Sequence, residues 1–207
     1  MAKSKRIELL ALLTKGSHTV LDIGTDHGLV LKEAFEKAYI TDAIASDINE
    51  KPLFQAKKNL KDHPVTYVIS DGFSQIKTPF DMVVIAGMGA FLITQILDLA
   101  PSDAHITYCL QANDKVEYLR KYLADHGFNI IDEHVLLDKF YYVILVVKRG
   151  IMTLTEEDRY LGPILKHKPE SQAYYAQKAA TIKKVLPKTD ALRKKALEKI
   201  YKIYHNL

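Results

Sequence analysis

The sequence predicts an α/β fold, in which a mostly parallel sheet is covered by helices on both faces and is followed by a helical hairpin. Short apolar runs rich in β-branched residues alternate five times with segments of helical spacing. Two strand-like runs then follow each other directly, and the strand signal disappears after Gly150. We therefore expect one domain over residues 1–150 and a helical domain over residues 151–207.

The five parallel strands are expected where the apolar runs are short and bounded by turn signals. These runs cover residues 19–23, 43–47, 65–69, 82–86 and 105–110. Helical spacing is found at residues 29–38, 52–60, 91–99 and 115–124. Strands linked by helical crossovers can be apolar throughout, because both faces of their sheet are covered. The successive runs 128–138 and 140–148 predict an antiparallel hairpin at the edge of the sheet.

Helices are also expected at both ends of the chain. Apolar residues at 7, 9, 10, 12 and 13 predict an N-terminal helix that packs on the first domain. Near the C-terminus, two helical stretches meet at residues 186–190, where Pro187 ends the first, and Thr189 or Asp190 can cap the second. The expected packing faces form a coiled-coil seam of Tyr175, Ala179, Ile182 and Leu186 against Leu192, Ala196, Ile200, Ile203 and Leu207.

Composition excludes several classes of protein. With 207 residues, 48% hydrophobic and 26% charged, the chain is neither disordered nor collagen-like. Its one cysteine, Cys109, cannot form an internal disulfide, and the eight histidines lack the spacing of a zinc site, so no metal is expected. No apolar run is long enough to span a membrane and no signal peptide is expected, so we predict a cytoplasmic protein without membrane association.

The basic charge is concentrated near the C-terminus. Residues 151–207 contain 12 Lys and Arg against 6 Asp and Glu, while the whole chain has a net charge of only +4. Such an excess is typical of a surface that binds a polyanion such as nucleic acid. A solvated lysine-rich helix face would produce the same count.

The first strand enters a turn that contains Gly24 and Gly28 and leads directly into a helix. A dinucleotide site would need a further glycine between them to approach a pyrophosphate. Asp26 and His27 stand there instead, and a carboxylate would repel a pyrophosphate. The turn therefore suits a cofactor that carries a cation and no phosphate, which is S-adenosylmethionine. Its predicted contacts here are Asp22, Gly24, Thr25, Asp26, His27 and Gly28.

Two further acidic residues end the second and third strands. Asp47 lies about 20 residues after Gly24, the spacing at which a carboxylate accepts hydrogen bonds from ribose hydroxyls, and Ile48 follows it. Asp71 and Gly72 are expected to meet the adenine amino group, with Phe73 covering the adenine ring. Helix capping or turn formation is the alternative for each acid taken alone.

Residues 86–89, Ala-Gly-Met-Gly, follow the fourth strand. The Asn/Asp-Pro-Pro-aromatic motif of enzymes that methylate exocyclic base amines is missing at this place. Gly87 and Gly89 leave room for the methionine part of the cofactor or for substrate to approach the backbone, with Met88 beside them. A tight turn between strand and helix is the alternative.

Three motifs carry a resemblance to a known family. Residues 23–27, Ile-Gly-Thr-Asp-His, resemble I-G-S-D-H; residues 85–89, Ile-Ala-Gly-Met-Gly, resemble I-A-G-M-G-G; and residues 110–113, Leu-Gln-Ala-Asn, resemble L-Q-P-N. These are motifs of the bacterial tRNA (adenine-22-N1)-methyltransferases, which belong to the class I methyltransferases. The chain departs from the motifs at Thr25, Ala90 and Ala112.

The resemblance implies a Rossmann-like, seven-stranded class I methyltransferase sheet with five parallel β/α units, an edge hairpin and a coiled-coil tail. It also implies methyl transfer from S-adenosylmethionine to N1 of adenine 22 in the D-arm region of tRNA, producing 1-methyladenosine. An acceptor for the 6-amino group of that adenine would assist the reaction. Asp26 is the first candidate and Asn113 the second, while Asp26 could instead hold the ammonium group of the cofactor.

Other residues are candidate contacts of a bound tRNA. For Arg120 the alternative is one member of a surface pair with Lys121, and for Tyr142 it is a core-facing position on a strand. The candidates are Met88, Gly89, Gln111, Arg120, Tyr142, Lys183, Lys184, Lys194 and Lys195. We expect a monomer that binds tRNA. The alternatives are a class I methyltransferase for another RNA, a protein or a small molecule, and a noncatalytic RNA-binding protein with a degenerate cofactor fold.

Overall fold

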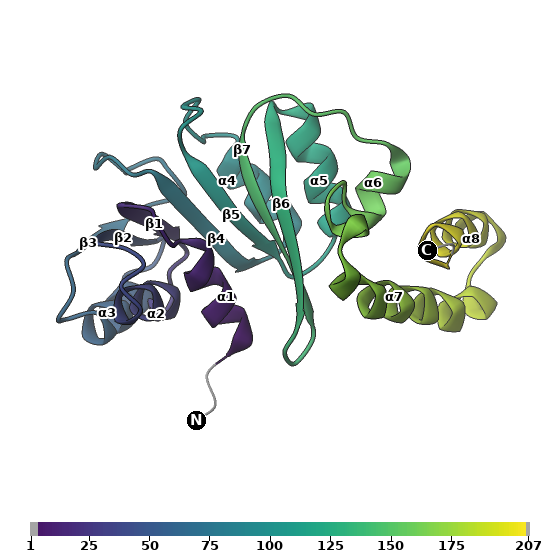
Figure 1. The fold of residues 1–207 in the computed structure, drawn as a ribbon, viewed down its shortest axis with the longest axis horizontal. Coiled ribbons are helices and arrows are strands. Elements are labelled where there is room, and N and C mark those ends of the chain that lie inside the picture. Colours follow the sequence, from purple (N-terminus) through teal and green to yellow (C-terminus); the bar gives the residue numbers. More distant parts are fainter. Residues whose placement is uncertain (1–3, 206–207) are drawn as a thin grey trace.

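The computed structural model describes residues 4–205, which form a seven-stranded sheet with helices on both faces and a helical extension beyond one edge (Figure 1). The strand order is β3-β2-β1-β4-β5-β7-β6. Strands β1 to β5 are parallel, and β7 pairs antiparallel with both β5 and β6. The predicted fold class is confirmed, including the antiparallel hairpin at the edge.

The strands lie close to their expected positions. They are β1 (Thr19–Ile23), β2 (Asp42–Asp47), β3 (Val65–Ile69), β4 (Met82–Met88), β5 (Thr107–Ala112), β6 (Phe128–Leu137) and β7 (Tyr141–Arg149). The helices are α1 (Lys5–Leu13), α2 (Leu29–Glu36), α3 (Glu50–Asn59), α4 (Ala90–Leu97), α5 (Val116–Asp125), α6 (Glu156–Leu161), α7 (Gln172–Val185) and α8 (Ala191–His205).

The third parallel unit departs from the predicted alternation, because no helix connects β3 to β4. The connection, residues 70–81, is held by side-chain bonds: the Ser70 hydroxyl donates to the Gly72 carbonyl and accepts from the Gln75 amide. Phe73, Ile76 and Phe80 anchor this segment in the core without a helical repeat.

The core has two layers, one on each face of the sheet. Alternate residues of β1 contribute to opposite layers: Val20 packs with Leu10 of α1, whereas Leu21 packs with Ile93 of α4. The expectation that the N-terminal helix packs on the domain is confirmed, because Leu10 and Ala11 are fully buried. That helix also places its first turn at the carboxyl end of the sheet.

The packing face of α8 agrees with the expected one at Ile200 and Ile203 but not nearer the start of the helix. Leu192 is 88% exposed and Ala196 is also exposed, while Tyr201 and Tyr204 pack toward the core with the two isoleucines. Tyr204 anchors this face of the helix, because its side chain is buried and its hydroxyl donates a hydrogen bond to the Tyr160 carbonyl (3.3 Å). Leu207, also assigned to this face, lies outside the described residues.

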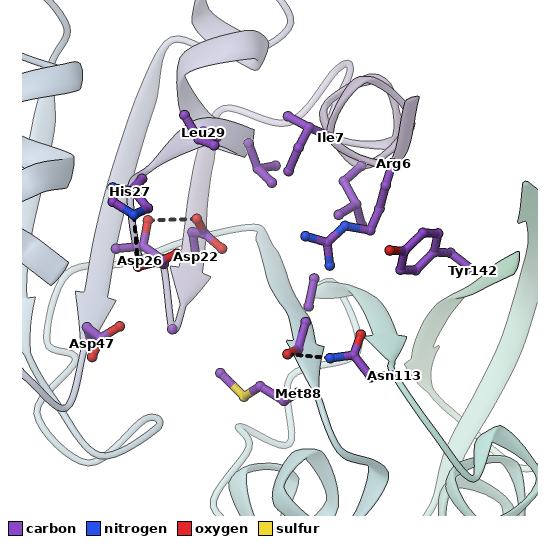
Figure 2. Close-up of a pocket in the computed structure, with 16 residues that line it drawn as sticks. Arg6, Ile7, Asp22, Asp26, His27, Leu29, Asp47, Met88, Asn113 and Tyr142 are labelled. Carbon is purple, nitrogen blue, oxygen red and sulfur yellow. Dashed lines mark hydrogen bonds and ion pairs between the residues drawn. The ribbon is translucent and has the colours of Figure 1, made fainter. Parts of the chain in front are cut away.

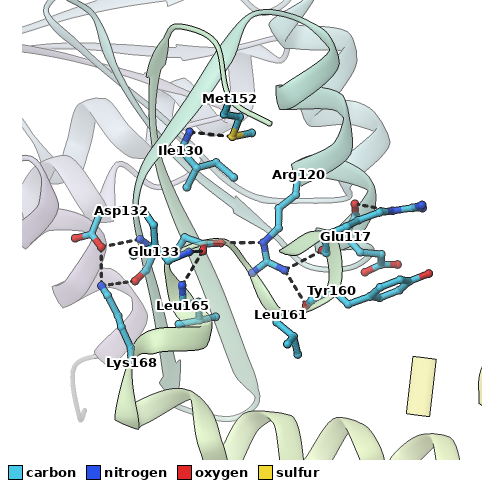
Figure 3. A network of polar contacts seen from close by, with 12 residues as sticks. Glu117, Arg120, Ile130, Asp132, Glu133, Met152, Tyr160, Leu161, Leu165 and Lys168 are labelled. Atoms are coloured by element: carbon cyan, nitrogen blue, oxygen red, sulfur yellow. Dashed lines mark hydrogen bonds and ion pairs between the residues drawn. The ribbon is translucent and has the colours of Figure 1, made fainter. Parts of the chain in front are cut away.

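A buried ion pair joins the segment after residue 150 to the sheet domain (Figure 3). Arg120 Nε donates to Glu133 Oε1 (2.8 Å), and neither side chain is exposed. Arg120 Nη1 also donates to the carbonyl oxygens of Arg159 and Tyr160, and Glu133 Oε2 accepts from two backbone amides that follow. Arg120 therefore cannot contact tRNA, and its predicted substrate role is wrong. Its charge is compensated inside the protein.

The same network requires a glycine at position 162. A Cβ there would lie 2.5 Å from Glu133 Oε2 and 2.7 Å from Arg120 Nη2, and the φ angle is +94°. The core is also continuous across residue 150, because Leu161, Tyr174 and Tyr175 belong to the same layer as Leu21. The proposed division at residue 150 stays a prediction, and the helical segment is fixed to the sheet domain.

The Arg120→Met variant tests the buried pair. Removing one partner leaves the Glu133 carboxylate buried without its counterion, so we expect a loss of about 3 to 5 kcal/mol in the free energy of unfolding. The measurement is urea unfolding. The control is Lys121→Met, which removes an exposed pair with Asp125 and should change stability by less than about 1 kcal/mol. Equal effects of the two variants would contradict the assignment.

Candidate active site

A cavity of about 540 Å³ opens at the carboxyl ends of β1, β2 and β4, beneath α1 (Figure 2). It brings together ten of the residues predicted to act at a site. These are Asp22, Gly24, Thr25, Asp26, His27, Asp47, Gly87, Met88, Asn113 and Tyr142. Residues from five segments of the sequence thus line one cavity.

The turn after β1 is held tightly against its neighbours. The amides of Gly24 and Thr25 both donate to the Ser46 carbonyl of β2, at 2.8 and 3.0 Å. Gly24 has a φ of +72°, and a Cβ at this position would lie 2.1 Å from the terminal methyl carbon of Met88. The left-handed φ angle is what favours glycine here, because the flexible end of the Met88 side chain could move away from an added Cβ.

One wall of the cavity is acidic. Asp22 and Asp47 are buried, while Asp26 follows in an exposed, left-handed conformation with its carboxylate 3.6 Å from His27 Nε2. Burial raises the pKa of Asp22 to about 6; the hydrogen bond from Thr25 opposes the rise, and the charge of Asp47 adds to it. A bound cation at this wall would therefore offset the cost of a buried carboxylate.

The opposite wall contains Arg6, Asn113 and Tyr142 (Figure 2). The Arg6 guanidinium lies 5.2 Å from the centre of the Tyr142 ring and donates to Gln111 Oε1 (2.8 Å). Asn113 Nδ2 donates to the Gly87 carbonyl (2.7 Å). Tyr142 thus faces the cavity and not the core.

Sequence reasoning missed six lining residues. Five of them lie on α1 and α2, where amphipathic character does not distinguish a residue that lines a cavity from one that packs in a core, and Ala86 lies within the 85–89 motif but was not assigned a contact. The six are Arg6, Ile7, Leu10, Leu29, Val30 and Ala86.

Several predicted cofactor contacts lie outside the cavity lining. Asp71 is exposed beyond β3, and Gly72 packs against Ile96. Phe73 was expected to cover an adenine ring, and this is wrong: it is buried, with its ring 6.2 Å from that of Phe80. Ile48 is exposed beside Asp47.

Two glycines that were predicted to contact ligand, Gly28 and Gly89, lie at the starts of helices instead. Gly28 precedes α2 and packs against Leu60, and Gly89 precedes α4 beside Asp114. Neither lines the cavity.

The remaining predicted tRNA contacts are Gln111, which is buried, and four lysines, which are exposed. Gln111 has no exposed surface, so the prediction that it contacts substrate directly is wrong. The tail lysines, which we define as Lys183, Lys184, Lys194 and Lys195, are all exposed on α7 and α8.

The described part of the chain contains neither a candidate metal site nor a helix suited to cross a membrane. Within residues 4–205, no group of three or more His, Cys, Asp or Glu side chains is arranged to hold a metal ion. None of the described helices combines the length and the apolar character that crossing a membrane requires.

Comparisons with known proteins agree with this geometry. The chain is 30% identical over 155 residues to the tRNA (adenine(22)-N(1))-methyltransferase of Bacillus subtilis (strain 168); the match covers 71% of this chain and 65% of that protein, just under two thirds of its length. A crystal structure from Streptococcus pneumoniae, assigned as a tRNA (m1A22) methyltransferase, superposes with a TM-score of 0.90 at 29% identity and covers 99% of both chains.

The S. pneumoniae protein has also been solved in complex with S-adenosyl-L-methionine, and that structure superposes with a TM-score of 0.86, again at 29% identity and over 99% of both chains. The family model described as tRNA (adenine(22)-N(1))-methyltransferase matches residues 20–206. This chain therefore belongs to the tRNA (adenine(22)-N(1))-methyltransferase family.

Proposed function

We propose that this protein is an enzyme that transfers a methyl group from S-adenosylmethionine to N1 of adenine 22 in tRNA. The observation that carries the proposal is the cavity itself, which gathers Gly24, Gly87 and Asn113 from the three family motifs at one sheet edge. Family membership over residues 20–206 supports the choice of substrate.

The residues of the cavity fit S-adenosylmethionine. Asp22 and Asp26 can accept hydrogen bonds from an ammonium group, and Asp47 at the end of β2 can accept from ribose hydroxyls. The complex of the S. pneumoniae relative with the same compound supports this assignment.

The chemistry requires little proton transfer. Bound at this site, S-adenosylmethionine would supply a methyl group to the in-plane lone pair of adenine N1, which needs no prior loss of a proton, and the electron pair of the broken carbon–sulfur bond would remain on S-adenosylhomocysteine. The residues of the chain orient the base and exclude water. An acceptor for the 6-amino group, Asn113 or Asp26, directs the base edge toward the cofactor and stabilises the cationic product.

The route by which tRNA reaches the site follows from a second, smaller cavity. It has a volume of about 160 Å³, shares Asn113 with the first cavity, and extends past Tyr141 to Tyr174 and Lys178 in the first half of α7. Figure 1 shows α7 continuing outward from this point toward α8. The tail lysines can therefore bind phosphates while a displaced base occupies the site.

The direct test is incubation with unmodified tRNA and isotopically labelled S-adenosylmethionine, followed by mass-spectrometric mapping of the modified nucleoside. We expect label in 1-methyladenosine at position 22, and no label in a tRNA that has uridine at that position. Transfer of label to a protein or a small molecule, with none in tRNA, would contradict the proposal.

The Asp22→Asn variant tests the acidic wall. A carboxyl whose pKa rises from 3.8 to about 6 on folding lowers stability as pH rises through that interval, by up to about 3 kcal/mol above pH 6. We expect Asp22→Asn to unfold at higher urea concentration than the parent at pH 7.5, with the difference disappearing near pH 4.

The same variant should bind S-adenosylmethionine about 10 to 100 times more weakly in calorimetric titration, because a charge-assisted hydrogen bond is lost. Substituting the exposed Asp62 by Asn is the control and should change neither property. A variant that is less stable at pH 7.5, or that binds the cofactor normally, would place Asp22 outside the cofactor site.

Replacing the four tail lysines by alanine tests the basic surface. We expect weaker tRNA binding and a salt dependence, plotted as log affinity against log salt, that is less steep by up to about 3 to 4. The control replaces four exposed lysines at the other end of the molecule, Lys37, Lys51, Lys57 and Lys58. Filter binding at several salt concentrations measures both sets. Equal slopes would show that tRNA binds elsewhere.

A further inference from the structure

A chain of hydrogen bonds runs behind the wall of the cavity, from α1 to the end of β4. Arg6 Nη1 donates to Gln111 Oε1 (2.8 Å), Gln111 Nε2 donates to Asn113 Oδ1 (3.1 Å), and Asn113 Nδ2 donates to the Gly87 carbonyl (2.7 Å). Four residues from three separate segments thus form one connected relay.

The two ends of this relay determine the orientation of both carboxamides between them. A guanidinium only donates hydrogen bonds, so Gln111 must turn its oxygen toward Arg6. A carbonyl only accepts, so Asn113 must turn its nitrogen toward Gly87. The middle bond then forms only with Gln111 as donor and Asn113 as acceptor. Rotating either amide by 180° would place like groups against each other at two of the three bonds.

Gln111 and Asn113 differ in their exposure to the cavity. Gln111 lies in the middle of the sheet, with Ala86 of β4 opposite it on one side and Ile144 of β7 on the other, and it has no exposed surface. Asn113 lies two residues later, beyond the strand end, where it is exposed and lines both cavities. Gln111 therefore can act on a bound base only through Asn113.

The relay uses half of the hydrogen-bonding capacity of Asn113. Its oxygen retains a second lone pair, and its nitrogen retains a second hydrogen. A freely rotating carboxamide could exchange these two groups and would present an acceptor and a donor with equal ease. A carboxamide held by the relay presents the acceptor in one place.

We propose that Gln111 is a positioning residue, which holds the Asn113 carboxamide so that its vacant acceptor receives the 6-amino group of the target adenine. This inference rests on the proposed function and names the contact that recognises the base. Arg6, which sequence reasoning missed, sets the direction of the relay and ties α1 to the cavity wall.

The test compares two RNA substrates, tRNA with adenine at position 22 and the same tRNA with unsubstituted purine there. Both bases have a lone pair at N1, and only adenine has the 6-amino group. For the wild-type protein we expect kcat/KM to favour adenine by at least about 100-fold, because purine leaves the Asn113 acceptor unpaired. The intrinsic difference in N1 reactivity cancels when this ratio is compared between variants.

Two substitutions interrupt the relay in different ways. Gln111→Met removes both polar groups at similar length, and Gln111→Glu keeps the acceptor for Arg6 but cannot, when ionised, donate to Asn113. We expect each to lower the adenine-to-purine ratio at least about tenfold, with the affinity for S-adenosylmethionine changed less than about twofold. Asn113→Ala should lower the ratio similarly, and adding Gln111→Met to it should cause no further loss. Gln95→Met, at an exposed position on α4, is the matched control and should leave the ratio unchanged.

Three results would overturn the inference. The first is an equal loss of kcat/KM on both RNAs in the Gln111 variants, which would indicate a structural role alone. The second is a wild-type protein that does not distinguish adenine from purine. The third is an additive loss when the Gln111 and Asn113 substitutions are combined. A wild-type protein that methylates neither RNA would instead reject the proposed function, and the inference with it.

Discussion

A parallel sheet brings the carboxyl ends of its strands to one edge, and every group proposed to act in this protein depends on that constraint. β1, β2, β4 and β5 end at the same edge, so Asp22, Asp47, Gly87 and Asn113 approach one another although more than 60 residues separate the first from the last two. The crossovers through α2, α3, α4 and α5 cover the faces and leave this edge open. α1 then packs across it and supplies Arg6.

The two walls of the cavity carry opposite charge, and this division determines what the cavity can hold. Asp22, Asp26 and Asp47 lie on the side of β1 and β2, whereas Arg6 lies on the side of β5 and β7 (Figure 2). The buried carboxylate of Asp22 is costly while the cavity is without a cation, as its raised pKa indicates. The buried carboxylate therefore lowers the free energy of unfolding, and binding of a cationic ligand beside it can restore the loss.

The fold and the acidic wall could be predicted because each depends on local signals: apolar runs of strand length, glycines in the turn after β1, and acids at strand ends. What could not be predicted depends on contacts between distant segments. Arg120 has the sequence neighbourhood of a surface residue, and only its pairing with Glu133 buries it. Phe73 follows the same pattern, since its ring turns into the core. On α8 the expected face is correct at Ile200 and Ile203 and wrong at Leu192, because apolar spacing alone does not show that Tyr201 and Tyr204 pack inward.

The cofactor assignment is tested by a crystal structure of the full chain with S-adenosylhomocysteine, the demethylated form of the proposed cofactor. This assignment predicts that the ligand occupies the cavity beneath α1, with its ribose hydroxyls on Asp47, its amino group at the acidic wall and its sulfur facing the side that contains Asn113. A ligand bound elsewhere, or a cavity closed by the protein's own side chains in crystals grown with saturating ligand, would contradict it.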